Sequence, residues 1–202
     1  MTATDDLPVA GTAVLLRTAA QGFEVLLMRR PDRGSFPGAW VFPGGKVEQR
    51  DRRDGADEQD DARRAAVRET LEEVGLVVTD PVVLSRWQPP AEAPVRIRTW
   101  FFLADAPDGV LRVSADEVVD AVWITPADAL QKHSAGEWVL FPPTWMTLHQ
   151  LGRFESAEEA LFAGGVARHF STRVVESDRG PAFEWDGLRL ETGSLPWRVV
   201  GS

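Results

Sequence analysis

The segment from Asp61 to Leu76 limits the possible folds of this chain more than any other part of the sequence. Its small and apolar residues recur at helical spacing, which predicts a helix over 61–74 with a stripe formed by Ala62, Ala65, Ala66, Thr70 and Val74. Asp60 or Asp61 can cap the start of this helix, and Gly75 stands where a left-handed C-terminal cap is expected. This is the clearest helix of the chain, and any proposed fold has to contain it.

The segments around this helix predict strands before it, and both strands and helices after it. Apolar runs predict two adjacent strands over 9–17 and 23–30, a short strand over 39–42, and strands over 76–87 (broken by Pro81), 96–104 and 118–124. Thr125-Pro126 opens a helix to about Lys132, and further helices are expected at 144–152 and 156–162. Strand-like pieces lie within 172–200. This order predicts an α+β fold, a mixed sheet flanked by helices. With 202 residues we expect one domain over 1–202, with a helical and strand-containing C-terminal extension from about 134.

Composition excludes several classes of protein. No run of about 18 apolar residues exists, so no membrane span or membrane partner is expected. The formal net charge of −9 argues against a broad nucleic-acid-binding surface. There is no cysteine, so disulfides and thiolate metal sites are excluded. The acidic N-terminus lacks the basic and apolar parts of a secretory signal, so a cytoplasmic location is expected.

Three carboxylates of the predicted helix form the first candidate site. Glu69, Glu72 and Glu73 are three and four positions apart, so they share one edge of the helix. Like charges at this spacing cost roughly 0.2–0.5 kcal/mol per pair, and a divalent cation such as Mg²⁺, which prefers oxygen ligands, would reverse that sign. Arg68 can pair with a carboxylate one turn on. The alternative is a solvated acidic helix face.

The sequence before the helix extends this pattern. Phe42-Pro43 leads into Gly44-Gly45, five residues separate Gly45 from Asp51, and Arg68-Glu69 is followed by Glu72-Glu73 and by Gly75-Leu76. This combination resembles the Nudix box, the sequence motif of the Nudix hydrolases. Three features depart from the family's pattern. Sixteen residues, rather than seven, separate Asp51 from Arg68, which corresponds to a nine-residue insertion in the charged stretch 49–61, and Thr70 replaces an aliphatic residue. Asp51 also stands where glutamate is usual.

The resemblance implies a fold, an activity and roles for several residues. The implied fold is a mixed β-sheet sandwiched between α-helices, and the activity is metal-dependent hydrolysis of the diphosphate linkage in a nucleoside diphosphate derivative. Glu72 and Glu73 would be the main ligands of Mg²⁺, with Mn²⁺ as an alternative ion. Glu69 would be a ligand or the base that activates water, Arg68 would orient Glu69, and Gly45 would lie near the metal. Glu117 is our candidate for a second acid, although a charged loop residue is an equally good interpretation.

Arginine and tryptophan residues are candidates for substrate binding. Arg29 and Arg30 end a predicted strand that points toward the box, and Arg96 and Arg98 alternate on another strand, so either pair can clamp phosphates. Arginines on a sheet are otherwise solvated or ion-paired. Trp40 is the candidate to stack on a base, together with Trp87 and Trp100, with core packing as the alternative for each.

The substrate itself is less well specified. The interrupted box resembles a Nudix branch that includes coenzyme A diphosphatases, and Arg29 and Gly38 match that branch's upstream signature. Phe36 and Arg30 depart from it, since histidine and serine are usual there. Coenzyme A or an acyl derivative is therefore the first expectation. Nucleotide sugars, NADH-like dinucleotides, noncanonical nucleoside triphosphates and a non-catalytic nucleotide-binding module remain as alternatives. The expected partner is a small nucleotide-derived substrate, and a homodimer is a possible assembly.

Overall fold

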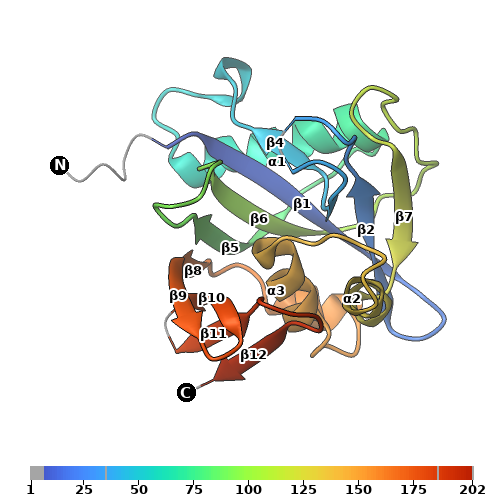
Figure 1. Cartoon of the computed structure of the whole chain (residues 1–202). Coiled ribbons are helices and arrows are strands. Elements are labelled where there is room, and N and C mark those ends of the chain that lie inside the picture. The colour runs from blue at the N-terminus through green and yellow to red at the C-terminus, as the bar shows by residue number, and fades with distance from the viewer. Residues whose placement is uncertain (1–6, 35, 186, 202) are drawn as a thin grey trace.

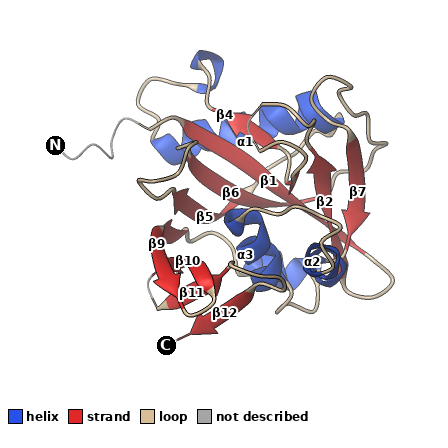
Figure 2. Cartoon of the chain, viewed as in Figure 1, coloured by secondary structure: helices blue, strands red, loops and turns tan. Residues whose placement is uncertain are grey.

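A mixed β-sheet forms the centre of the protein in the computed structural model, which describes residues 7–34, 36–185 and 187–201. Figure 1 shows the chain coloured along its length, and Figure 2 shows the strands running between helices. The strands of this sheet are β1 (Val9–Thr18), β2 (Phe23–Arg29), β3 (Trp40–Val41), β4 (Gly44–Lys46), β5 (Val82–Gln88), β6 (Arg98–Asp105), β7 (Asp120–Ile124) and β8 (Arg168–Ser171).

The order of the strands brings segments that are far apart in the sequence together. The main path is β3-β2-β1-β6-β5-β8, with β4 paired to β1 and β7 paired to β2. The β1–β6 pair is parallel and runs from Val9 opposite Arg98 to Leu16 opposite Asp105. The β5–β8 pair is also parallel, and the remaining pairs of this sheet are antiparallel.

Helix α1 (Glu58–Val74) covers one face of the sheet and packs on β1 and β6. The predicted stripe is buried as expected, and the small side chains Ala62 and Ala66 let the helix approach the sheet closely. Gly11 of β1 lies under the helix, and a Cβ atom there would meet the Ala62 carbonyl oxygen at 1.8 Å. Glycine at position 11 is therefore required by the distance between α1 and β1.

The ends of α1 confirm one prediction and correct another. Gly75 adopts the left-handed conformation with φ 75°, as predicted, and its N–H donates to the Leu71 carbonyl. The helix begins at Glu58, earlier than expected, and its cap is Asp57, which accepts from the Asp60 N–H at 2.8 Å. Asp60 and Asp61 lie in the first turn, so the prediction that one of them is the cap is wrong.

The other face of the sheet is covered by α2 (Pro126–Ser134), α3 (Pro142–Leu151) and α4 (Ala157–Phe162). Thr125 caps α2, and Pro126 occupies its first turn, as predicted. Leu148 and Leu151 of α3 pack with Val14, Leu16 and other sheet residues in one buried cluster. Helices on both faces of a mixed sheet confirm the α+β sandwich.

A second, antiparallel sheet follows, formed by β9 (Arg173–Ser177), β10 (Gly180–Trp185), β11 (Leu188–Glu191) and β12 (Arg198–Gly201). Trp185 and Leu190 of this sheet belong to the same buried cluster as Trp87 and Phe170 of the central sheet. Figure 1 shows these strands, in orange and red, beside α3 and β8.

Several predicted boundaries are wrong. The strand expected over 76–87 begins only at Val82, and Leu76 and Val78 are buried without being part of a strand. Strands β4, β8 and β10 were not predicted. Among the helices of the described residues, none combines the length and the apolar character needed to cross a bilayer.

Candidate active site

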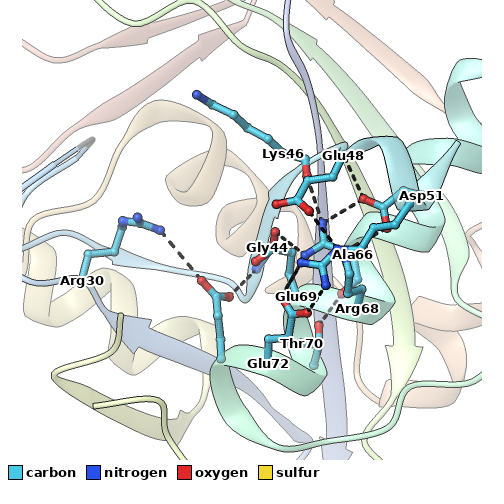
Figure 3. Close-up of polar contacts among 12 residues, drawn as sticks. Arg30, Gly44, Lys46, Glu48, Asp51, Ala66, Arg68, Glu69, Thr70 and Glu72 are labelled. Atoms are coloured by element: carbon cyan, nitrogen blue, oxygen red, sulfur yellow. Dashed lines mark hydrogen bonds and ion pairs between the residues drawn. The ribbon is translucent and has the colours of Figure 1, made fainter. Parts of the chain in front are cut away.

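The three glutamates of the predicted site lie in the last turns of α1, beside β4 and the short 3₁₀ helix η1 (Gln49–Asp51). Figure 3 shows Glu69 and Glu72 close to Arg68, with Gly44 between them and Arg30. The antiparallel pairing of β4 with β1 holds Gly44 and Gly45 next to the helix. The structure therefore brings together the two halves of the motif, which are separated in the sequence by the loop and by the first turns of α1.

Glu73 is the most deeply buried of these carboxylates, with a relative exposure of 3%. One oxygen accepts the Gly44 N–H at 2.8 Å, and the other lies 4.0 Å from the Arg30 guanidinium. Burial raises the pKa of Glu73 from its ordinary value of 4.5 to about 8, although the hydrogen bond from Gly44 opposes that shift. A negative charge on Glu73 is thus compensated only in part by the surrounding protein, and without a further positive charge Glu73 keeps its proton up to about pH 8.

Glu69 lies directly against the backbone of Gly45. A Cβ atom on Gly45 would be 2.3 Å from the carboxyl carbon of Glu69, so a side chain there would displace the carboxylate. Burial raises the pKa of Glu69, while the hydrogen bond from Arg68 opposes this shift. Glycine at position 45 leaves the space that the Glu69 carboxylate occupies.

Arg68 links both carboxylates to the loop before the helix. Its Nη1 donates to Glu69 at 2.8 Å and to Glu72 at 2.9 Å, and its Nη2 donates to the Lys46 carbonyl at 3.1 Å. Its Nε and Nη2 also form a two-pronged pair with the carboxylate of Asp51, at 2.9 and 2.8 Å. The pKa of Arg68 is raised, first of all by the hydrogen bond with Asp51.

Asp51 has a structural role that the sequence left undefined. It is 3% exposed and accepts the Glu48 N–H at 2.9 Å in addition to its two bonds from Arg68. Burial alone would raise the pKa of Asp51, but the hydrogen bonds from Arg68 and Glu48 outweigh this effect, and the pKa is lowered. Asp51 is therefore ionised and anchors Arg68. Its spacing from Gly45 was the sequence signal that pointed to it.

Glu72 lies at the exposed edge of the site, between two guanidinium groups. Arg68 approaches it from α1, and Arg50 of η1 lies 3.1 Å away. Arg50 also donates to Glu48 at 2.8 Å. Arg50 and Glu48 could not be identified from the sequence, because only the folded loop places them beside the helix.

Arg30 and Glu117 approach the cluster from other elements. Arg30 follows β2 and points toward the carboxylates in Figure 3. Glu117 is exposed in the turn before β7, and its charge contributes to the raised pKa values of both Glu69 and Glu73. This turn is tied to the end of α1, since the Ser114 N–H donates to the Glu73 carbonyl at 2.9 Å.

Arg29 and Trp40 lie beside an open pocket of about 410 Å³ at the same end of β2. Arg29 pairs with Asp32 at 3.5 Å, and the Trp40 ring stacks on Trp138 with centroids 3.9 Å apart. One face of the Trp40 ring is thus already covered. The other polar residues lining the pocket are Asp120 and Glu137.

The structure does not bring Arg98 to the carboxylates. Arg98 is buried at the start of β6, where it pairs with Glu58 in the first turn of α1 and donates to Gln88 at 3.1 Å. Arg96 lies outside β6, so the expected alternation of the two arginines on one strand is wrong. Trp87 and Trp100 are buried, and Trp100 donates to Glu58 at 2.8 Å.

The donor set of the cluster fits a hard divalent cation. Glu69, Glu72 and Glu73 lie in the last turns of α1, and the charge of Glu117 acts on Glu69 and Glu73; carboxylate oxygens are the ligands that Mg²⁺ and Mn²⁺ prefer. Within the described residues, no three acidic or histidine side chains already stand in a metal-binding arrangement. Arg68, Arg50 and the Gly44 N–H occupy oxygens of Glu69, Glu72 and Glu73 instead.

Comparisons with known proteins agree with this architecture. The family model of the Nudix domain matches residues 7–144 of this chain. The structure is similar to a Nudix hydrolase from Alicyclobacillus acidocaldarius, with a TM-score of 0.71, 26% identity, and coverage of 80% of this chain and 98% of that one. No curated protein matches the chain.

Two further solved structures share the fold. A MutT Nudix hydrolase from Burkholderia pseudomallei has a TM-score of 0.56 at 24% identity and covers 72% of this chain and 98% of its own. The Nudix domain of NrtR from Shewanella oneidensis, solved with ADP-ribose, has a TM-score of 0.58 at 20% identity. The match covers 74% of this chain and 88% of that one.

The fold and the carboxylate cluster together define a pyrophosphohydrolase. The chain belongs to the Nudix family, whose hydrolases act on nucleoside diphosphate derivatives.

Proposed function

We propose that this protein is a Mg²⁺-dependent diphosphohydrolase, with Mn²⁺ as an alternative ion, and that coenzyme A or an acyl-coenzyme A is its substrate. The observation that carries the metal dependence is the burial of Glu73 beside Glu69 and Glu72 at the end of α1, where the ionised form of Glu73 is only partly compensated by the protein. A divalent ion supplies the missing positive charge, activates a bound water and neutralises charge on the diphosphate.

The residues of the chain have separate roles in this proposal. Glu72 and Glu73 would hold the ion together with the Gly45 carbonyl, and Glu69 would be a further ligand or would accept the proton of the attacking water. Arg68 keeps Glu69 oriented through its bond of 2.8 Å. Glu117 is the second acid, since its charge acts on both Glu69 and Glu73.

Arg30 binds a phosphate oxygen of the substrate, because it directly follows β2 and lies next to Glu73. The part of the substrate beyond the diphosphate occupies the pocket beside Arg29 and Trp40, at the same end of β2. Arg98 has no role in binding phosphate here, because its guanidinium is bound to Glu58 and Gln88. Arg96 stays a candidate for binding phosphate, although it lies outside β6 and does not alternate with Arg98 on that strand.

The choice of coenzyme A rests on the resemblance of the interrupted box to that of the coenzyme A diphosphatase branch. It also rests on Arg29 and Gly38, which match the upstream signature of that branch and line the pocket. ADP-ribose is an alternative, since it is bound by the NrtR Nudix domain, which shares the fold. Nucleotide sugars, NADH-like dinucleotides and noncanonical nucleoside triphosphates complete the set of candidates.

The test is hydrolysis of this panel with Mg²⁺, with Mn²⁺ and with EDTA. We expect EDTA-sensitive cleavage of coenzyme A compounds, with release of a phosphopantetheine product, and a loss of turnover of about a hundredfold or more in Glu73→Gln. Cleavage of another compound of the panel would support the assignment as a diphosphohydrolase and reject coenzyme A as the substrate. Nucleotide binding without any turnover would instead support the non-catalytic module.

A further inference from the structure

Arg50 is held in a different way from the other arginine that contacts Glu72. Arg68 is anchored by the buried Asp51, by the Lys46 carbonyl and by Glu69, and its side chain is only 14% exposed. Arg50 contacts two exposed carboxylates, Glu48 at 2.8 Å and Glu72 at 3.1 Å, and its own side chain is 56% exposed. Exposed ion pairs of this kind are weak, whereas a buried two-pronged pair is strong. Arg50 is thus the guanidinium that can leave Glu72 most easily.

The position of Arg50 puts it in competition with a cation at Glu72. Its Nη1 lies 3.1 Å from one oxygen of Glu72 and its Nη2 lies 3.5 Å from the other, so both oxygens have a donor from Arg50. An ion bound by Glu72 would neutralise the carboxylate charge that attracts Arg50. The ion and the Arg50 guanidinium would also repel each other, because both are cations beside one carboxylate.

A diphosphate brings the matching negative charge to the same place. Phosphate oxygens share the coordination shell of Mg²⁺ with carboxylates, and arginine binds phosphate through paired N–H donors. η1 is fixed by the bond from the Glu48 N–H to Asp51, so the backbone of Arg50 stays beside the site while its long side chain turns.

We propose that Arg50 is a substrate-binding residue that occupies Glu72 in the metal-free protein and turns to a phosphate oxygen of the diphosphate when the ion binds. This inference rests on the proposed function, because it places the metal ion at Glu72. It adds to that function a residue that no position of the motif specifies and that holds the substrate beside Arg30.

The first experiment measures the binding of Mn²⁺ alone by calorimetry in the absence of substrate. Arg50→Gln removes the competing guanidinium, so we expect Mn²⁺ to bind about two- to fivefold more tightly, the range that corresponds to an exposed ion pair. Arg50→Lys keeps the charge but not the paired donors, so its affinity for Mn²⁺ should lie between that of the wild type and that of Arg50→Gln. A purely structural role of Arg50 would leave the affinity unchanged or weaken it.

The matched control is Arg53→Gln, which removes the same charge three residues further along. Arg53 is exposed, and among the described contacts it forms none with Glu48, Glu69, Glu72 or Glu73. This variant measures the general effect of net charge on the affinity for Mn²⁺. We expect its affinity to stay within about twofold of the wild type, since exposed charges at a distance are screened.

The second experiment uses the diphosphate substrate that the panel identifies, at saturating Mn²⁺. Arg50→Gln should raise KM about tenfold with little change in kcat, because a charge-assisted bond to phosphate is lost from both the ground state and the transition state. Tighter binding of Mn²⁺ together with a raised KM supports the proposal. An unchanged or weaker affinity for Mn²⁺, or an unchanged KM, overturns it while the proposed function stands. If the wild type neither binds Mn²⁺ nor cleaves any member of the panel, the proposed function fails and this inference fails with it.

Discussion

At the scale of single residues, Asp51 shows how one buried side chain can control a site that it does not enter. It holds the Arg68 guanidinium with two bonds, and Arg68 in turn holds Glu69 and Glu72. Aspartate is shorter than the glutamate usual at this box position, and Asp51, at the end of η1, still forms both bonds with Arg68. The carboxylate therefore reaches Arg68 despite the long, charged loop between them.

Asp51→Asn should lower kcat by about tenfold or more and leave KM within about threefold, because Arg68 loses one strong acceptor and Glu69 loses its fixed orientation. Breaking a buried pair also destabilises the fold by about 3–5 kcal/mol. Steady-state kinetics and urea unfolding measure the two effects. Asp54→Asn, an exposed change in the same loop, should affect neither. Equal losses in the two variants would argue against the anchoring role.

Glu73 makes the stability of the metal-free protein depend on pH. Its pKa is raised to about 8 in the folded protein, so the folded state binds more protons than the unfolded state between the ordinary value near 4.5 and about 8. The free energy of unfolding in EDTA should therefore fall as the pH rises through this window, by about 1.4 kcal/mol for each unit of pKa shift at most.

Glu73→Gln removes this titration, so its stability in EDTA should vary less with pH than that of the wild type and should exceed it near about pH 8. Urea unfolding from about pH 5 to about pH 8 measures this difference. Glu155→Gln, at an exposed position before α4, is the control and should follow the wild-type curve. Parallel curves for the wild type and Glu73→Gln would mean that Glu73 is not the titrating group.

At the scale of elements, the close contact between β1 and α1 holds the site in place. Gly11→Ala would put a methyl group against the Ala62 carbonyl, which is backbone and cannot turn away. We expect a loss of about 1–3 kcal/mol or more, measured by thermal unfolding, because α1 must shift off the sheet. Gly152→Ala is the control. The nearest atom to a Cβ there is 3.6 Å away, so the stability should be nearly unchanged. A stable Gly11→Ala variant would show that α1 can move without cost.

The elements that the sequence predicted well are those whose information is local. Glu69, Glu72 and Glu73 lie on one helix, so their spacing alone places them together, and Thr125 and Gly75 mark helix ends through their own backbone preferences. Thr70 fits its buried position because its hydroxyl donates to the Ala66 carbonyl at 2.7 Å.

Features that depend on distant residues could not be predicted in this way. Strand β4 contains two glycines and is a strand only because β1 pairs with it. Arg98 was assigned to phosphate binding because its partner Glu58 lies 40 positions away in the sequence and next to it only in the fold. Arg50 meets Glu72 for the same reason, across 22 positions.

At the scale of the whole molecule, the C-terminal sheet and the catalytic half of the chain share one buried cluster. Trp185 of β10 packs edge-on against Trp87 of β5 with centroids 5.3 Å apart, and against Phe170 of β8 at 5.9 Å. Its Nε1 donates to Thr172 at 2.8 Å. We propose on this basis that residues 7–201 unfold as one cooperative unit.

Trp185→Leu tests this cooperativity, because it removes aromatic contacts from the C-terminal sheet while leaving the carboxylate cluster intact. We expect a loss of about 2–4 kcal/mol, since a large buried side chain is shortened, and a fall of several degrees in Tm. The same fall in Tm should be measured by far-ultraviolet circular dichroism and by the loss of Mn²⁺ binding on heating. Phe162→Leu is the control, because Phe162 is 93% exposed and its loss should leave Tm unchanged. If the C-terminal sheet unfolds separately, circular dichroism will show two transitions, and the temperature at which Mn²⁺ binding is lost will be the same in Trp185→Leu as in the wild type.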